Sequence, residues 1–280
     1  MIWFLEFRER DVGGPVVPGQ VAFPTGISDP SATRDALSVQ QHITFLIHGF
    51  NVNRASGRAA LHAFAAELSR TPPLLPPGAA LVAVTWPGDS WAGPLGYPLE
   101  GNDADDTAAA LADFIETWIP PGARFDFITH SMGARVAFET LKRLPRGAYV
   151  IGEVCAMAPA VDDVSVSEPP AYRAQVKDAS RVAVLASRAD TVLRLAYPIG
   201  DLAQAFLFFW KDVSGLALGY HGPRPGRFAP VPPNVVSVQI PTADGVGHSD
   251  YLFTGAPNNK QSRAVRFAGD ALAGAASPRY

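Results

Sequence analysis

A serine that follows an apolar run and precedes a helical pattern is the residue in this sequence best placed to do chemistry. The run Phe125–Ile128 predicts a buried strand, Ala134–Leu144 predicts a helix, and Ser131 falls in the turn between them. Such a turn lifts a hydroxyl clear of a sheet, and the helix N-terminus behind it favours a developing negative charge. A serine at this place is also a common helix N-cap. Whether Ser131 is a nucleophile or only an N-cap therefore depends on whether the sequence also supplies the other groups that serine catalysis requires.

The motif around the serine departs from the usual nucleophile turn at one position. Glycines normally stand two residues before and two residues after the nucleophile. Gly133 occupies the second of these positions, but Thr129 occupies the first. The larger side chain must fit beneath the turn, which weakens the match to the motif, but the change removes no reacting group.

A general base is the second group that acyl transfer by a serine requires. His248 lies in a glycine-flanked loop between the predicted strand Val235–Ile240 and the last predicted helix. An imidazole with an ordinary pKa of about 6.5 can accept a proton at neutral pH. Among the remaining histidines, His221 in a Gly/Pro-rich loop is the competitor for this role.

A carboxylate that orients the base is the third group. Asp190 follows the predicted strand Arg181–Ala186, two strands beyond the one that leads to Ser131, and from there it can reach the base. Its alternative role is a helix N-cap, since Asp caps helices well. Asp162, in the loop after the preceding strand, is the rival candidate for the acid.

Donors for the oxyanion are the last requirement. The apolar run Ile43–Ile47 leads into His48-Gly49-Phe50, a tight turn whose backbone N–H can point at a reacting oxygen. We expect the amides of Phe50 and Met132 to be the two donors, and His48 to be structural. Loss of one such donor typically lowers the rate about 100- to 1000-fold.

The order of these candidates along the chain is Ser131, Asp190 and then His248, which is the order of the α/β-hydrolase fold. From about residue 43 to residue 273, the sequence resembles the α/β-hydrolase superfamily. Three motifs are similar to those of a bacterial branch of lipase- and esterase-like serine hydrolases: His48-Gly49-Phe50-Asn51, Thr85-Trp86-Pro87 and Thr129-His130-Ser131-Met132-Gly133-Ala134-Arg135.

This resemblance implies a triad of Ser131, Asp190 and His248, with Phe50 and Met132 as the oxyanion hole. It implies hydrolysis of a small-molecule carboxylic ester through an acyl-enzyme intermediate. The same triad could instead serve an amidase, a peptidase or an acyltransferase. A hydrolase fold can also be a non-catalytic binding protein, because a fold does not determine a function.

Short apolar strands alternate with helical patterns over most of the chain, which favours an α/β fold. Strands that are apolar on both faces predict a mostly parallel central sheet, covered by helices on both faces. The first ten residues predict an additional strand at the N-terminus. The other expected strands are Ile43–Ile47, Ala80–Trp86, Phe125–Thr129, Gly152–Met157, Arg181–Ala186 and Val235–Ile240, and the expected helices are Ser56–Ser69, Ala104–Ile119, Ser131–Leu144, Asp201–Val213 and Gln261–Ala273.

The length and composition predict a single domain over residues 1–280, because no linker-like segment divides the chain. Two segments, 87–102 and 198–233, interrupt the alternation and are candidates for cap or lid insertions. Several aromatic residues are candidates to line an apolar acyl pocket: Trp86, Trp91, Tyr97, Phe206, Phe208, Phe209 and Trp210.

Charge and motif content argue against several other classes of protein. The net charge is −3 and Lys and Arg do not cluster, so we expect no nucleic-acid partner. We expect no membrane span, because no apolar run approaches about 20 residues, and no secretory signal, which suggests a cytoplasmic protein. Zinc-ligand spacing and glycine-rich nucleotide motifs are absent from the sequence, so we expect neither a metal nor a cofactor.

Overall fold

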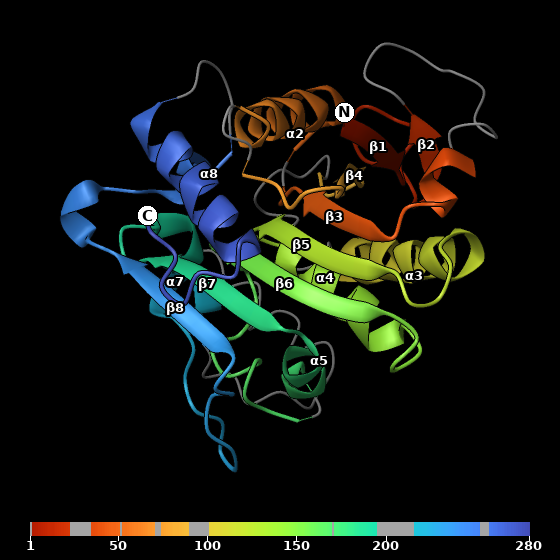
Figure 1. Ribbon diagram of the computed structural model, residues 1–280. Coiled ribbons are helices and arrows are strands. Elements are labelled where there is room, and N and C mark those ends of the chain that lie inside the picture. Colours follow the sequence, from red (N-terminus) through yellow and green to blue (C-terminus); the bar gives the residue numbers. More distant parts are fainter. Residues whose placement is uncertain are drawn as a thin grey trace.

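A central sheet organises the molecule (Figure 1). The computed structural model describes residues 2–22, 35–50, 52–70, 74–89, 101–169, 171–194, 216–252 and 258–280. Within these ranges the sheet has 8 strands in the order β2-β1-β4-β3-β5-β6-β7-β8. The strands are β1 (Ile2–Glu6), β2 (Gln20–Ala22), β3 (His42–Ile47), β4 (Ala80–Thr85), β5 (Arg124–His130), β6 (Val150–Met157), β7 (Arg181–Ser187) and β8 (Val235–Ile240).

The strand pairs within this sheet are parallel except β1 with β2, which is antiparallel. The central strands are buried on both faces, as their largely apolar sequences predict. Aromatic rings fill the space beside β3 and β5, where Phe45 stacks on Phe127 at 5.3 Å and meets the edge of Phe125 at 5.6 Å between centroids.

Helices cover both faces of the sheet (Figure 1). They are α2 (Arg54–Leu68), α3 (Gly101–Trp118), α4 (Gly133–Arg143), α5 (Arg173–Asp178), α7 (Leu218–His221) and α8 (Asn259–Leu272). Helices α2 and α8 contact each other, whereas α4 contacts α3 and α5. Right-handed crossovers explain this separation, because the chain moves from β3 to β4 in one direction and from β4 through β5, β6 and β7 in the other.

The predicted α/β-hydrolase fold is therefore confirmed, with element boundaries shifted by a few residues. The structure adds β2, α5 and α7, which are too short to give a clear periodic signal in the sequence. The predicted helix Asp201–Val213 lies outside the described residues, as do most of the predicted insertion 87–102 and half of the predicted insertion 198–233. The single domain and its cap or lid insertions remain predictions.

The reversal of chain direction beside β3 creates the place where a site is expected. Strand β3 lies between β4 and β5, so the loops that follow β3 and β5 leave the same edge of the sheet side by side. Open α/β sheets bind ligands at such switch points, outside the carboxyl ends of the strands.

A buried arginine ties the N-terminal segment to two loops at this edge. The Arg8 guanidinium donates to the carbonyl oxygens of Val52 and Trp86, both at 3.0 Å, and to Asp89 Oδ1 at 2.6 Å. It also donates to the carbonyl oxygens of Arg10 and Asp11. Burying a charge is costly unless it is paired and fully hydrogen-bonded, and this guanidinium meets both conditions.

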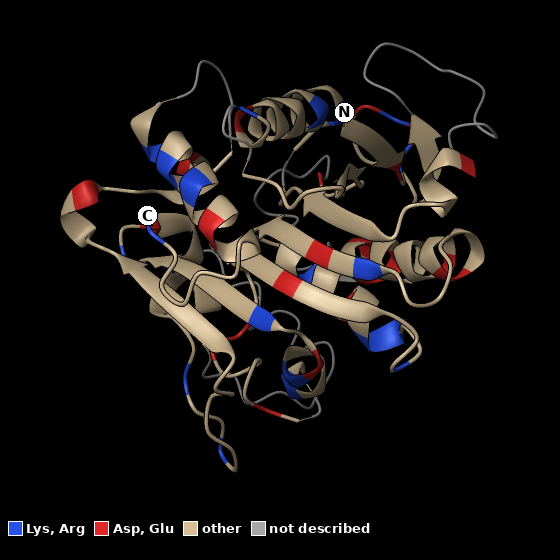
Figure 2. Cartoon of the chain, viewed as in Figure 1, with Lys and Arg blue, Asp and Glu red and all other residues tan. Residues whose placement is uncertain are grey.

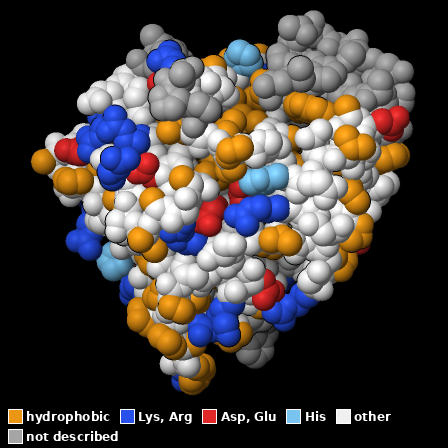
Figure 3. Space-filling view, viewed as in Figure 1, with side chains coloured by type: hydrophobic (Ala, Val, Ile, Leu, Met, Phe, Trp, Pro, Cys, Tyr) orange, Lys and Arg blue, Asp and Glu red, His pale blue; other side chains and the backbone are white. Residues whose placement is uncertain are grey.

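Charged residues also line the amino-terminal halves of β5, β6 and β7, and Figure 2 shows acidic and basic residues on these neighbouring strands. The buried Asp126 lies 2.5 Å from His42 Nε2 and accepts from the Glu153 amide at 2.8 Å. Glu153 in turn accepts from Arg181 at 3.0 Å. Figure 3 has the same view as Figure 1 and shows basic, acidic and histidine side chains gathered near the centre of the visible surface. The buried acidic side chains on β5 and β6 are thus paired with neighbouring histidine and arginine side chains.

None of the described helices combines the length and the apolar character that a membrane span requires.

Replacing Arg8 with Met should destabilise the protein by about 3–5 kcal/mol, because the buried Asp89 carboxylate would lose its charged partner. Urea denaturation measures the change in the free energy of unfolding. Arg146→Met is the matched control, since Arg146 forms its ion pair with Asp178 at the surface. Equal, small shifts of the unfolding midpoint in both variants would contradict the structural role of Arg8.

Candidate active site

Ser131 occupies a sharp turn between β5 and α4. Its φ of 54° is in the left-handed region, which costs a non-glycine residue about 1–3 kcal/mol. Two backbone hydrogen bonds join the turn to the end of β6 and the residues after it: the Ser131 N–H donates to the Met157 carbonyl oxygen at 3.0 Å, and the Ala160 N–H donates to the Ser131 carbonyl oxygen at 3.1 Å. The end of β6 therefore stabilises the strained conformation after β5.

Two glycines allow the chain to approach this turn closely. A Cβ atom on Gly133 would lie 2.7 Å from the carbonyl oxygens of Ile47 and His48. A Cβ atom on Gly49 would lie 2.7 Å from the Cβ atom of Ser131. Neither position tolerates a side chain without movement of the backbone, so these glycines let the loop after β3 lie directly against the serine.

Thr129 replaces the first glycine of the usual motif without disturbing the turn. Its side chain is fully buried, and its hydroxyl lies 3.4 Å from the Cys155 carbonyl oxygen on β6. The structure accommodates the larger side chain beneath the turn, as the motif requires.

The His248 imidazole joins the serine to an aspartate. Its Nε2 lies 2.8 Å from Ser131 Oγ, and its Nδ1 lies 2.7 Å from Asp190 Oδ2. An ionised carboxylate can only accept a hydrogen bond, so Nδ1 carries the proton and Nε2 accepts from the hydroxyl. This tautomer is the one that a general base needs, with its free electron pair directed at the serine proton.

Asp190 makes both of the contacts that its two suggested roles require. While Oδ2 accepts from His248, Oδ1 accepts from the backbone N–H of Leu193 at 3.0 Å. The second bond caps the helical turn that begins at Thr191. Because the carboxylate is fully buried and bonded through both oxygens, its position is well defined.

Asp162 and His221, the alternative candidates for the acid and the base, have other partners. The partners of the two ring nitrogens of His248 are Ser131 and Asp190. The backbone of Asp162 forms an isolated bridge to Ala217. The competing histidine, His221, has its Nδ1 at 3.6 Å from Asp163 Oδ2.

The loop after β3 is shaped by His48. Its Nδ1 donates to the Gly49 carbonyl oxygen at 2.7 Å, and its Nε2 accepts from the Trp86 N–H at 3.3 Å. The Trp86 indole N–H donates back to the His48 carbonyl oxygen at 3.0 Å. Since the Gly49 carbonyl is turned towards His48, the N–H of the same trans peptide, that of Phe50, points the opposite way. This orientation suits the oxyanion role expected of Phe50.

Met132, the other expected donor, directly precedes α4 and serves as its N-cap residue. The first amides of a helix have no partner within the helix and are oriented to meet an anion. The assignment of Phe50 and Met132 as oxyanion donors remains a prediction.

Two buried histidines beside the site are held neutral. Burial is the largest effect that lowers the pKa of His48 to about 4 and that of His130 to about 3. The nearby Arg8 also lowers the first pKa, and the nearby His248 also lowers the second. Nothing in the spacing of these two residues in the sequence indicates these environments.

Of the aromatic residues proposed to line an acyl pocket, Trp86 lies within the described residues. It is buried and stacks on His48 at 5.7 Å between ring centroids. Trp86 therefore supports the loop after β3. The other six candidates lie outside the described residues.

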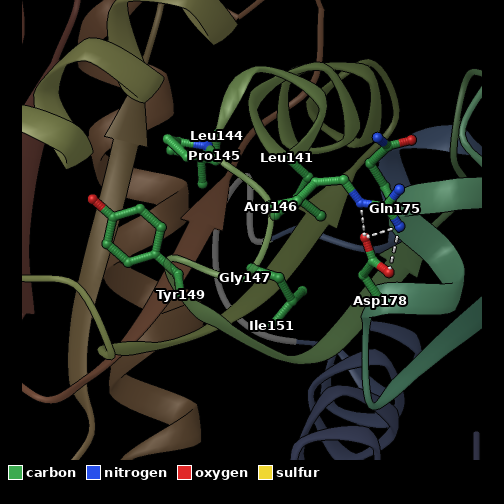
Figure 4. Close-up of a pocket in the computed structure, with 9 residues that line it drawn as sticks. All are labelled: Leu141, Leu144, Pro145, Arg146, Gly147, Tyr149, Ile151, Gln175 and Asp178. Atoms are coloured by element: carbon green, nitrogen blue, oxygen red, sulfur yellow. Dashed lines mark hydrogen bonds and ion pairs between the residues drawn. The ribbon is translucent and has the colours of Figure 1, made fainter.

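A surface pocket lies at the opposite end of β6 (Figure 4). Its lining comes from the end of α4, the following turn and α5, and includes the Arg146–Asp178 ion pair. The pocket reaches the start of β6, whereas Ser131 lies beside its last residue, Met157. An eight-residue strand is about 25 Å long, so this pocket is separate from the candidate site.

The family profile described as alpha/beta hydrolase of unknown function (DUF900) matches residues 31–203, more than half of the chain. The chain belongs to this hydrolase family. The matched part contains Ser131 and Asp190, while His248 lies beyond it. A search of curated proteins finds no significant match to this hydrolase.

Solved structures similar to this hydrolase include two esterases. The propionate-bound esterase from Thermogutta terrifontis is 11% identical, with 86% of each chain covered and a TM-score of 0.42. An esterase from Pyrobaculum calidifontis is 16% identical, with 85% of this chain and 78% of that chain covered and a TM-score of 0.41.

The free energy of unfolding of this hydrolase should fall as the pH decreases from about 6.5 towards 4. His48 and His130 bind protons less tightly when folded than when unfolded, where the pKa is 6.5. Their stabilising contribution is therefore complete above pH 6.5 and is lost towards their folded pKa values. Each should contribute a slope of about 1.4 kcal/mol per pH unit in this window. Urea denaturation at pH 7, 6, 5 and 4.5 measures it.

His130→Gln should reduce that slope by the share of one histidine, whereas His62→Gln should leave it unchanged, because His62 is exposed on α2. A wild-type stability that stays constant between pH 6.5 and 5 would show that the two buried histidines do not resist protonation.

Proposed function

We propose that this α/β hydrolase is a serine hydrolase that cleaves small carboxylic esters through an acyl-enzyme intermediate. The observation that carries the proposal is the continuous path from the Ser131 hydroxyl to the His248 imidazole and on to the Asp190 carboxylate, with distances of 2.8 and 2.7 Å. These distances are within the range in which a base can remove the proton of a nucleophile.

In the first half of the reaction, the Ser131 oxygen attacks the acyl carbon while its proton moves to His248 Nε2. Asp190 stabilises the resulting imidazolium and keeps Nδ1 protonated. The amides of Phe50 and Met132 stabilise the negative charge on the former carbonyl oxygen. The tetrahedral intermediate then collapses, and His248 gives its proton to the departing alkoxide, which leaves as an alcohol.

In the second half, water takes the place of the alcohol. His248 removes a proton from this water as its oxygen attacks the acyl carbon of the ester on Ser131. Collapse of the second tetrahedral intermediate returns the proton to Ser131 and releases the carboxylic acid. Each proton that His248 accepts is given back, so the residue ends each cycle in its starting state.

Burial of the two anchoring groups supports this assignment. Ser131 is 3% exposed and Asp190 is fully buried. A hydrogen bond between an imidazolium and a carboxylate is stronger away from water than in it, and a surface pair of the same residues would gain much less. The strained φ of Ser131 is also typical of functional turns.

Ser131→Ala should abolish turnover of p-nitrophenyl acetate and butyrate while the protein remains folded, because the nucleophile is lost. Release of p-nitrophenolate measures the activity, and circular dichroism checks the fold. A fluorophosphonate probe should label the wild type at Ser131 and fail to label the variant. Ester turnover that persists in the variant would show that another residue is the nucleophile.

Asp190→Asn should lower kcat by about four orders of magnitude, since a neutral amide favours the wrong tautomer of His248. Asn also caps helices well, so the turn at Thr191 should stay intact. Asp162→Asn is the matched control and should retain most of the activity. The reverse ranking of the two variants in p-nitrophenyl butyrate kinetics would transfer the acid role to Asp162.

A further inference from the structure

His130, the residue before the nucleophile, contacts the proposed base in two ways. Its Nε2 lies 2.9 Å from the backbone carbonyl oxygen of His248. The two imidazole rings lie 4.9 Å apart between centroids, at an angle of 42°. A carbonyl oxygen can only accept a hydrogen bond, so His130 carries its proton on Nε2 and donates it to the main chain of His248.

The need for such a contact follows from the sheet. Strand β8, which leads to His248, is three positions away from β5, which leads to Ser131. Neighbouring strands are about 4.8 Å apart, so the loop after β8 must reach back across about 14 Å. A loop that extends this far over the edge of the sheet holds its position only where it is anchored.

The loop has one anchor near β7 and one near β5. The Ser187 hydroxyl, at the end of β7, donates to the carbonyl oxygen of Val246 at 2.7 Å. The His130 imidazole, at the end of β5, holds His248 itself. The ring of Tyr251, which follows His248 in the chain, also packs against His130, at 5.6 Å between centroids. Val246 is thereby fixed to the end of β7, and His248 to the end of β5.

We propose that His130 is a positioning residue, which fixes the backbone of His248 so that its Nε2 stays within reach of the Ser131 hydroxyl. This inference rests on the proposed serine-hydrolase function. The imidazole of His248 is bonded to Ser131 and Asp190, but neither bond restrains its main chain. The hydrogen bond from His130 supplies that third restraint, and it comes from the residue adjacent to the nucleophile.

The protonation state of His130 suits this role. Burial, followed by the proximity of His248, lowers the pKa of His130 to about 3. The ring is therefore neutral when ester hydrolysis takes place, and it does not oppose the positive charge that forms on His248. Other groups that face it are the buried Tyr251 and His48.

The test compares His130→Gln with His130→Asn. A glutamine places its amide nitrogen near the position of Nε2 and can renew the bond to the His248 carbonyl, whereas asparagine is too short. We expect kcat for p-nitrophenyl butyrate to stay within about threefold of wild type in the Gln variant. In the Asn variant it should fall about 10- to 100-fold, with KM changed less than about twofold, because a misplacement of about 1 Å can cost 100-fold in rate.

His130→Phe provides a second comparison, because it retains an aromatic ring but has no donor, and it should lose as much kcat as the Asn variant. His62→Asn, on the exposed face of α2, is the control and should behave as wild type. Melting temperatures show whether a loss follows from instability.

Equal kcat values for the Gln and Asn variants, or losses that follow melting temperature alone, would overturn the positioning role. Wild-type protein without ester turnover or fluorophosphonate labelling would instead refute the proposed function, so the two failures are distinguishable. Rescue by Gln together with losses in Asn and Phe supports the proposal.

Discussion

An imidazole bonded to a hydroxyl through one nitrogen and to a carboxylate through the other is the interaction on which this site depends. His248 meets both requirements at 2.8 and 2.7 Å. It can do so because the strands that lead to Ser131, Asp190 and His248 run parallel and end at the same edge of the sheet. The loops at that edge must then hold their geometry to within a fraction of an ångström, which explains why so many backbone hydrogen bonds converge there.

Buried polar groups provide this rigidity, and each avoids the cost of burial in its own way. Arg8 remains charged but is paired with Asp89 and bonded to backbone carbonyls. His48 and His130 become neutral, so that each can bond to the main chain without carrying a charge. Because an unpaired buried polar group is expensive, a fully bonded network favours a single arrangement of the surrounding loops. The loops after β3, β4 and β8 are each held in this manner.

Much of the candidate site could be predicted because its signals are local. A strand, a serine and a helix in succession identify Ser131, and the chain order of the other candidates agrees with the hydrolase fold. The positions of Arg8 and His130 could not be predicted, because their partners are distant in the sequence: Asp89 is 81 residues from Arg8, and His248 is 118 residues from His130. Neither residue lies in a pattern that separates it from an ordinary arginine or turn histidine.

By itself, the sequence determined the strands other than β2, the helices α2, α3, α4 and α8, and the kinds of groups available at the strand ends. Hydrophobic periodicity and turn residues act over a few neighbours, and a single chain displays them directly. Only the tertiary structure decided which of those groups meet: that Asp190 rather than Asp162 bonds to His248, and that Thr129 fits where a glycine is usual. Such choices depend on the order and register of the strands, which bring together residues with no local relation in the chain.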